Sequence, residues 1–281
     1  MAGMRMTEVL AIARLEWSDV RRSRWVVFCG GLYALLAAAF VGIGLRESGV
    51  VGFTGMPRVL ASLSHALVLL LPLLALAGTA LSVNRARESG GLELLLSQPV
   101  TRDQYFAAVT IVRAGALLVP LAVFMGALAV TARGMLDQPV PWAFLGRGLA
   151  VCAALTWAFA GVGLAISTTV REPSRAVVYV LGVWALAVAL LDFVLVGVLL
   201  QWRVPAAVVF AVAASNPVEA ARLALLAGAS PSLDTLGPVG VYLVRWLGAT
   251  WLWLIGVTWP LVVGTAAWLA ARRRFRRGEV V

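Results

Sequence analysis

Residues 62–83, SLSHALVLLLPLLALAGTALSV, decide the fold of this chain because they contain no Asp, Glu or Arg. A helix of this length crosses about 30 Å of hydrocarbon. The 281 residues are 62% hydrophobic and 13% charged, whereas a soluble domain carries about 25% charge. Similar runs recur along the chain. The sequence therefore predicts an all-α membrane protein, a single domain over residues 1–281, with six transmembrane helices at 25–45, 62–83, 105–130, 143–168, 176–200 and 245–270.

The arginines predict the orientation of these helices. The net charge is +10, and every basic side chain is Arg, since the sequence contains no Lys. Five arginines fall in loops on one side of the membrane and three lie within or at the ends of spans. The other fifteen fall on the opposite side, at positions 5, 14, 21, 22, 24, 85, 87, 102, 171, 175, 272, 273, 274, 276 and 277. The positive-inside rule then places both termini in the cytoplasm.

Residues 1–24 predict an amphipathic helix before the first span. At 100° per residue, one arc collects the apolar side chains, with charged side chains opposite. We expect this helix to lie in the membrane interface, and a helix docked on a partner protein is the alternative. The apolar arc consists of Met6, Val9, Leu10, Ala13, Trp17 and Val20.

Residues 201–244 form the longest segment between spans, on the extracytoplasmic side. Asn216, Pro217 and Glu219 have the spacing of an N-cap, a first helical residue and a capping-box carboxylate. We expect a re-entrant or interfacial helix-turn-helix here, with a helix that reaches Leu226. Asn216, Pro217, Glu219 and Arg222 are candidate contacts for a periplasmic partner. The alternative is a lid that folds back on the spans.

Three charged residues fall within or beside the spans. Ionisable groups at this depth are costly and usually face protein or water. Asp192 is expected either in a structural ion pair or in a substrate or gating role. Arg147 is expected near the same outer level, and Arg113 is expected to extend its side chain to the inner interface.

The sequence excludes most enzyme chemistry. A Walker A loop needs a Lys, and multi-histidine metal sites need more than the single His65. Met56, His65 and Met135 could offer soft ligands to copper, but they are scattered over two loops. Cys29 and Cys152 lie in apolar runs and are expected to pack as small hydrophobes. No catalytic residue, metal site or bound cofactor is predicted.

The cytoplasmic loop at 84–104 contains RARESGGLELLLSQPVTR at residues 85–102. This segment resembles the coupling loop of the membrane subunits of type-2 ABC exporters, whose pattern is E-x-G-[TS]-L-E-L-L-L-x-x-P-x-x-R. Gly91 replaces the usual Thr or Ser, and Ala108 and Val109 replace a common Gly-Lys. The matching residues are Glu88, Gly90, Leu92, Glu93, Leu94, Leu95, Leu96, Pro99 and Arg102.

The resemblance covers the whole chain and implies a permease subunit of a prokaryotic inner membrane. It implies a homodimer whose loop binds a cytoplasmic ATPase, with ATP and Mg²⁺ held by that partner. The 93–102 loop, NPVEAARLALLAG at 216–228 and the basic end further resemble subunits that serve maturation of a copper–sulfur enzyme, nitrous oxide reductase. Mechanical transmission across the membrane and export of a hydrophobic drug or lipid are the two functions expected. Membrane lipid is an expected partner, and nucleic acid is not.

Overall fold

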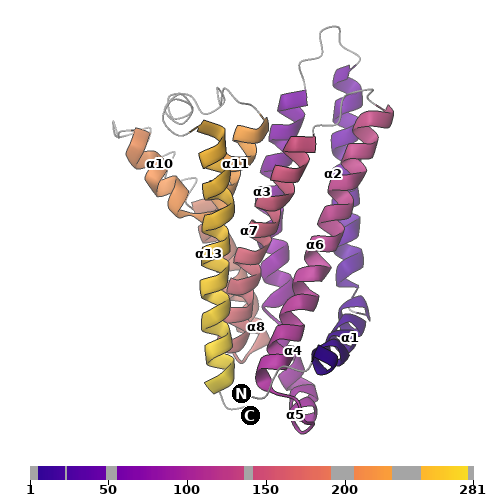
Figure 1. Ribbon diagram of the computed structural model, residues 1–281, viewed down its shortest axis with the longest axis vertical. Coiled ribbons are helices and arrows are strands. Elements are labelled where there is room, and N and C mark those ends of the chain that lie inside the picture. The colour runs from indigo at the N-terminus through magenta and orange to yellow at the C-terminus, as the bar shows by residue number, and fades with distance from the viewer. Residues whose placement is uncertain are drawn as a thin grey trace.

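The computed structural model describes residues 6–22, 24–48, 56–135, 142–190, 206–229 and 248–277, and these ranges contain helices and turns but no strand. Five long helices run side by side along the molecule (Figure 1). They are α2 (Trp25–Ser48), α3 (Met56–Thr79), α6 (Arg102–Met135), α7 (Trp142–Thr169) and α13 (Gly248–Arg277).

Shorter helices lie at the two ends of this bundle. At the lower end in Figure 1, α1 (Met6–Arg22) crosses the foot of α6, next to α4 (Ser82–Glu88) and α5 (Gly91–Leu96). Helix α8 (Pro173–Trp184) continues into the π-helix η1 (Ala185–Leu190). At the upper end, α10 (Ala206–Ser215) and α11 (Pro217–Ala229) form a V.

Within the described residues, four helical segments are long and apolar enough to cross a membrane: His65–Glu88, Arg102–Ala127, Trp142–Thr169 and Gly248–Arg277. They coincide with the predicted second, third, fourth and sixth spans. The first and fifth predicted spans coincide with α2 and with α8 plus η1, where shorter apolar stretches are described. The all-helical prediction is confirmed, and the count of six spans stays a prediction.

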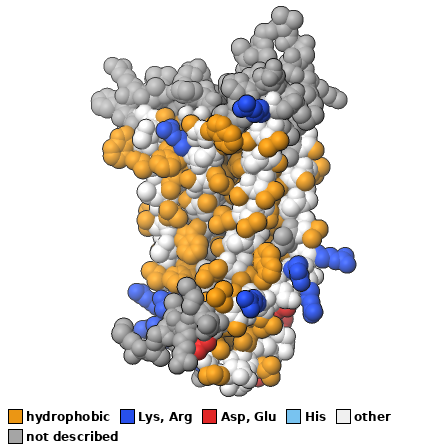
Figure 2. All heavy atoms as spheres, turned by 45° about the vertical axis from the view of Figure 1, so that its right-hand side comes forward, with side chains coloured by type: hydrophobic (Ala, Val, Ile, Leu, Met, Phe, Trp, Pro, Cys, Tyr) orange, Lys and Arg blue, Asp and Glu red, His pale blue; other side chains and the backbone are white. Residues whose placement is uncertain are grey.

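The surface has the distribution of side chains that a membrane requires. Hydrophobic side chains cover the middle of the bundle, and most of the visible Arg side chains lie near its lower end (Figure 2). Several large apolar side chains of the long helices and of α8 are more than half exposed, which is costly in water and favourable in lipid or against a partner. They include Val27, Leu35, Val123, Val130, Val178 and Trp251.

Glycines bring α7 and α13 into backbone contact. A Cβ atom placed on Gly161 would lie 2.3 Å from the Gly264 carbonyl oxygen, and one on Gly264 would lie 2.7 Å from the Trp157 carbonyl oxygen. The small residues Ala154 and Ala158 on the same helix are buried. The stripe of small residues in the fourth predicted span therefore serves close helix approach.

The α10–α11 hairpin enters the bundle from its upper end. Its turn is fixed by the Trp259 indole N–H, which donates to the Ser215 carbonyl at 2.8 Å. Trp259 lies eleven residues into α13, about 16 Å from that helix's start at 1.5 Å per residue. Helix α11 packs against α13, α3 and α7. The described part of this segment therefore packs as a hairpin against the bundle, and its depth in a membrane stays a prediction.

Candidate functional site

The candidate coupling loop is a tight helix-turn-helix at the foot of the bundle. Helix α4 continues the second span, and Gly90 reverses the chain with φ = +69°, a conformation that glycine adopts without strain. The Val83 backbone N–H donates to the Ser167 hydroxyl of α7 at 2.9 Å. The loop therefore begins on a fixed support.

Helix α5 divides its side chains between two faces. Leu92 is buried at 1% exposure, and Leu95 and Leu96 pack beside it. Leu94 points outward at 73% exposure. Glu88, Glu93 and Pro99 are exposed as well. The leucines of the motif therefore have different environments. Leu92 packs in the core, whereas Leu94 is exposed, as are the carboxylates of Glu88 and Glu93.

A capping box that our sequence analysis overlooked begins α6. The Thr101 N–H and hydroxyl donate to Gln104 Oε1 at 2.7 and 2.9 Å, and the Gln104 N–H donates back to the Thr101 hydroxyl at 3.3 Å. The Gln104 amide also donates to the Glu8 carboxylate of α1. The T-x-x-Q spacing was a readable signal for this cap.

Arg102 and Asp103 join the start of α6 to the end of α13. The Arg102 guanidinium donates to the Arg276 carbonyl at 3.1 Å, near the end of the last helix. Asp103 accepts from Arg272 at 3.0 Å and lies 3.6 Å from Arg276. Arg102, which the resemblance assigns to coupling, is half-buried and also joins these two helices.

Glu16 and Arg113 connect α1 to the bundle. The Glu16 carboxylate lies 3.7 Å from the Arg113 guanidinium, which also donates to the Gly78 carbonyl at 3.3 Å. Burial raises the pKa of Glu16, because the lost hydration outweighs the attraction of Arg113. The expectation that Arg113 extends to the inner interface stays a prediction, and the structure adds that α1 supplies its counter-ion. Glu16 lies in the middle of the buried face of α1. A carboxylate at that position of the helical pattern indicates a buried ion pair, which our sequence analysis overlooked.

One small core joins all of these elements. Val9 and Ile12 of α1 meet Leu92 of α5, Phe106 of α6 and Phe275 of α13. The Phe106 and Phe275 rings stack with centroids 5.6 Å apart. Leu10 and Trp17, expected on the same apolar arc as Val9, are 52% and 41% exposed. Helix α1 thus has one face on the bundle and a second apolar strip facing outward.

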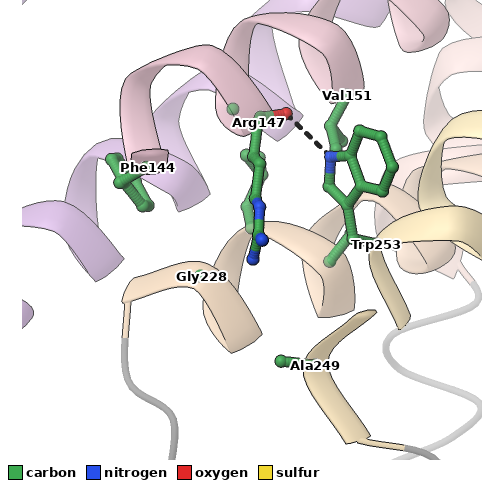
Figure 3. Close-up of a pocket in the computed structure, with 9 residues that line it drawn as sticks. Phe144, Arg147, Val151, Gly228, Ala249 and Trp253 are labelled. Carbon is green, nitrogen blue, oxygen red and sulfur yellow. Dashed lines mark hydrogen bonds between the residues drawn. The ribbon is translucent and has the colours of Figure 1, made fainter. Parts of the chain in front are cut away.

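Arg147 lies at the opposite end of the molecule. Its side chain lies between Phe144 and Trp253 and points toward Gly228, at the carboxyl end of α11 (Figure 3). That end of a helix carries partial negative charge. The Trp253 indole N–H donates to the Arg147 carbonyl at 3.2 Å. The cavity between these side chains measures about 10 Å³, enough for roughly one water molecule. Asp192 lies outside the described residues.

Asn216 joins the hairpin to span five. Its side-chain oxygen accepts from the Val218 N–H at 3.0 Å, as predicted for an N-cap. Its side-chain amide donates to the Ala187 carbonyl of the π-helix η1 at 2.6 Å. Glu219 pairs with Arg222 at 3.1 Å. Asn216 and Glu219 are buried against their own chain, which favours the lid alternative over a contact with a partner.

The His, Cys, Asp and Glu side chains of the described residues are dispersed over the bundle. Within these residues no group of three or more His, Cys, Asp or Glu side chains could hold a metal ion. Cys29 and Cys152 are unpaired and fully buried, as predicted for packing residues. The polar contacts described above link helices to one another, and the outer face of α5 is exposed.

Comparison with known proteins decides the family. Residues 10–271 match the family described as ABC-2 family transporter protein. The chain belongs to the ABC-2 family of transporter proteins. It is 32% identical over 277 residues to the probable ABC transporter permease protein NosY of Stutzerimonas stutzeri, covering 96% of this chain and 99% of that protein. It is 30% identical over 285 residues to the NosY of Pseudomonas aeruginosa, covering 98% and 100%.

The chain is therefore an ABC-2 permease subunit, embedded in a membrane and similar to NosY. A permease of this kind is part of a transporter complex that includes an ATPase subunit. The family is generally not catalytic itself, in agreement with the sequence analysis.

Proposed function

We propose that the exposed face of α5 binds the ATPase subunit and passes its motion to α1, α6 and α13. The observation that carries this proposal is the division of the 84–104 loop. Leu92 enters the core shared by those helices, while Leu94, Glu88 and Glu93 face outward. A force applied to the outer face reaches three helices through one packed cluster, because close-packed interiors transmit strain.

Paired substitutions test this role. Leu94→Asp and Glu88→Arg should abolish co-purification of the cognate ATPase while leaving the melting temperature of the permease unchanged. Glu172→Arg reverses another exposed carboxylate, in the loop between α7 and α8, and should leave the ATPase bound. Leu92→Ala should lower the melting temperature, because it removes a buried side chain. Normal ATPase binding and stimulation by both Leu94→Asp and Glu88→Arg would refute the assignment.

We infer that the active unit is a homodimer with six spans per chain and both termini in the cytoplasm of a prokaryotic cell. The asymmetry of arginines and the apolar exposed belt support this arrangement. In a cysteine-free background, Cys at Asp137 or Asp234 should react with an impermeant thiol reagent from outside, and Cys at Ser89 should not. Labelling of Ser89→Cys from outside would reverse the orientation.

We propose mechanical transmission to a periplasmic process as the function, and maturation of nitrous oxide reductase, with its copper–sulfur site, as that process. The similarity to NosY over nearly the whole chain supports it. So does the small size of the cavity beside Arg147, which leaves no room for a cargo there. The test is complementation: a strain that lacks its own NosY should regain active nitrous oxide reductase with this chain and lose it again with Leu94→Asp.

Export of a hydrophobic molecule is the second candidate. An apolar groove of about 410 Å³ lies between α10 and α13, with the Trp259 ring on its wall. A groove open to the side could take a drug or lipid directly from the bilayer. Trp259→Ala should then reduce export of such a compound without affecting enzyme maturation. If it instead abolishes maturation and leaves compound export at background, transmission is the function that remains.

A further inference from the structure

The five arginines at the end of α13 divide into two sets that face different neighbours. Arg272 and Arg276 lie one turn apart and pair with Asp103 of α6. Arg273, Arg274 and Arg277 lie on the other side of the helix, as their i, i+1 and i+4 spacing requires. All three are exposed, and within the described residues none of the ion pairs includes them.

These three arginines line a groove between the last turns of α7 and α13. Its volume is about 590 Å³, which exceeds the size of a phospholipid headgroup and admits the start of its acyl chains. Arginines occupy the side toward the helix ends, and methyl groups of alanines form the wall toward the membrane. The other lining residues are Ala165, Thr168, Thr169, Ala270 and Ala271.

Among the described residues, the acidic side chains nearest to this groove along the chain are already paired, and Glu279 lies outside the described residues. Glu172, three residues after α7, lies 2.7 Å from Arg175. Asp103 is held by Arg272 and Arg276 on the far side of α13. The Thr168 hydroxyl already donates to the Ala165 carbonyl within α7. Of the two threonines that line the groove, the exposed Thr169 is therefore the one whose hydroxyl can meet a ligand. Within the described ranges, three guanidinium groups therefore line one groove to which no carboxylate contributes, and guanidinium is the cation best suited to phosphate.

We propose that this groove binds the phosphate of an anionic phospholipid, with the acyl chains along the alanine wall. The depth supports a lipid over a soluble anion, because the groove lies where two membrane-spanning helices end. Clusters of Lys and Arg directly beside a transmembrane helix attract anionic lipid in general. Here the cluster also has a shaped recess. The lipid would hold α7 and α13 together below their glycine contact.

The proposal rests on the proposed orientation only for the leaflet, which would be the cytoplasmic one. If the lipid binds but thiol labelling places Ser89 outside, the orientation fails and the lipid site stands. If labelling agrees and no lipid binds, the site fails and the orientation stands. The two failures are therefore distinguishable.

The experiment uses the purified full-length chain, stripped of lipid in mild detergent and titrated with phosphatidylglycerol or phosphatidylcholine, with bound lipid counted by native mass spectrometry. Replacing Arg273, Arg274 and Arg277 together by Gln should weaken phosphatidylglycerol binding about 100-fold, at roughly fivefold for each basic residue near an anionic headgroup. The matched control replaces Arg14, Arg21 and Arg22, three exposed arginines of α1. It makes the same charge change and should bind as the wild type does.

A second variant keeps the charge and fills the space. Ala270→Trp leaves all three arginines in place and should also exclude the lipid, which protects the test if the triple variant fails to fold. Four results would overturn the proposal: equal loss in the control triple variant, equal binding of phosphatidylcholine, displacement by millimolar inorganic phosphate, or a triple variant that keeps the lipid but loses the ATPase. The last two would identify a free-anion site and a protein-docking site.

Discussion

Gly161→Ala tests the closest contact in the bundle. The added methyl carbon would lie 2.3 Å from the Gly264 carbonyl oxygen, 3.1 Å from its carbon and 3.2 Å from its Cα. A methyl group and a carbonyl oxygen need about 3.3 Å, and backbone atoms cannot rotate away, so α7 and α13 must separate by about 1 Å. Overpacking of this kind costs about 1–3 kcal/mol, against a gain of up to about 1 kcal/mol from the helix propensity of Ala.

We therefore expect Gly161→Ala to lose about 1 kcal/mol of stability, or roughly 2–4 °C in melting temperature at about 2–4 °C per kcal/mol. The chain carries its own reporters, since Cys29 and Cys152 are both 0% exposed and become reactive on unfolding. A fluorogenic maleimide in a thermal ramp measures that transition. Gly126→Ala is the matched control, because its Cβ would meet nothing within 4 Å. Wild-type melting of Gly161→Ala would refute the close helix packing inferred here.

Three further predictions concern polar contacts. Arg113→Gln leaves Glu16 buried without its cation, which should cost about 3–5 kcal/mol at pH 8. Because the Glu16 pKa is raised in the folded state, folding favours the protonated acid. The stability lost in Arg113→Gln should therefore be small below the unfolded pKa of about 4.3 and should grow as the pH rises through the folded pKa. Melting curves from pH 5 to pH 8 measure this dependence. A loss of stability that does not change with pH would contradict this cause. Asn216→Asp keeps the cap of α11 but loses the donor to Ala187. Its melting temperature should therefore fall between those of the wild type and Asn216→Ala, with about 1 kcal/mol of stability lost for each contact removed. Equal melting temperatures of the two variants would contradict separate contributions from the cap and the donor. Arg102→Gln should loosen the end of α13, seen as faster hydrogen exchange of the last turn, and an unchanged rate would show that Asp103 alone holds that end.

The sequence predicted the helices well because each long apolar run must be satisfied in lipid by its own backbone hydrogen bonds. The Asn216 cap was predictable for a similar reason, since capping depends on residues only two or three positions apart. These features are local, so the neighbouring residues contain the information.

Contacts between distant residues were not predictable from one sequence. Glu16 had several arginines within reach of a flexible helix, and only the fold selects Arg113. The depth of the α10–α11 hairpin is a second case. Helices of 10 and 13 residues are too short to cross a bilayer, at about 15 and 20 Å, so they fit an outer surface as well as a re-entrant position. The position of the turn beside α13 depends on the contact between Ser215 and Trp259, which only the three-dimensional structure reveals.

The small core around Leu92 has a consequence for biosynthesis. It combines side chains from the first helix of the chain, such as Val9, with Phe275 from the last one. A ribosome therefore delivers the final part of this core only after every span has been made. Until then the core around α1 and α5 lacks the part that α13 supplies. If the proposed ATPase surface depends on this core, we expect the ATPase to bind finished permeases more tightly than nascent ones.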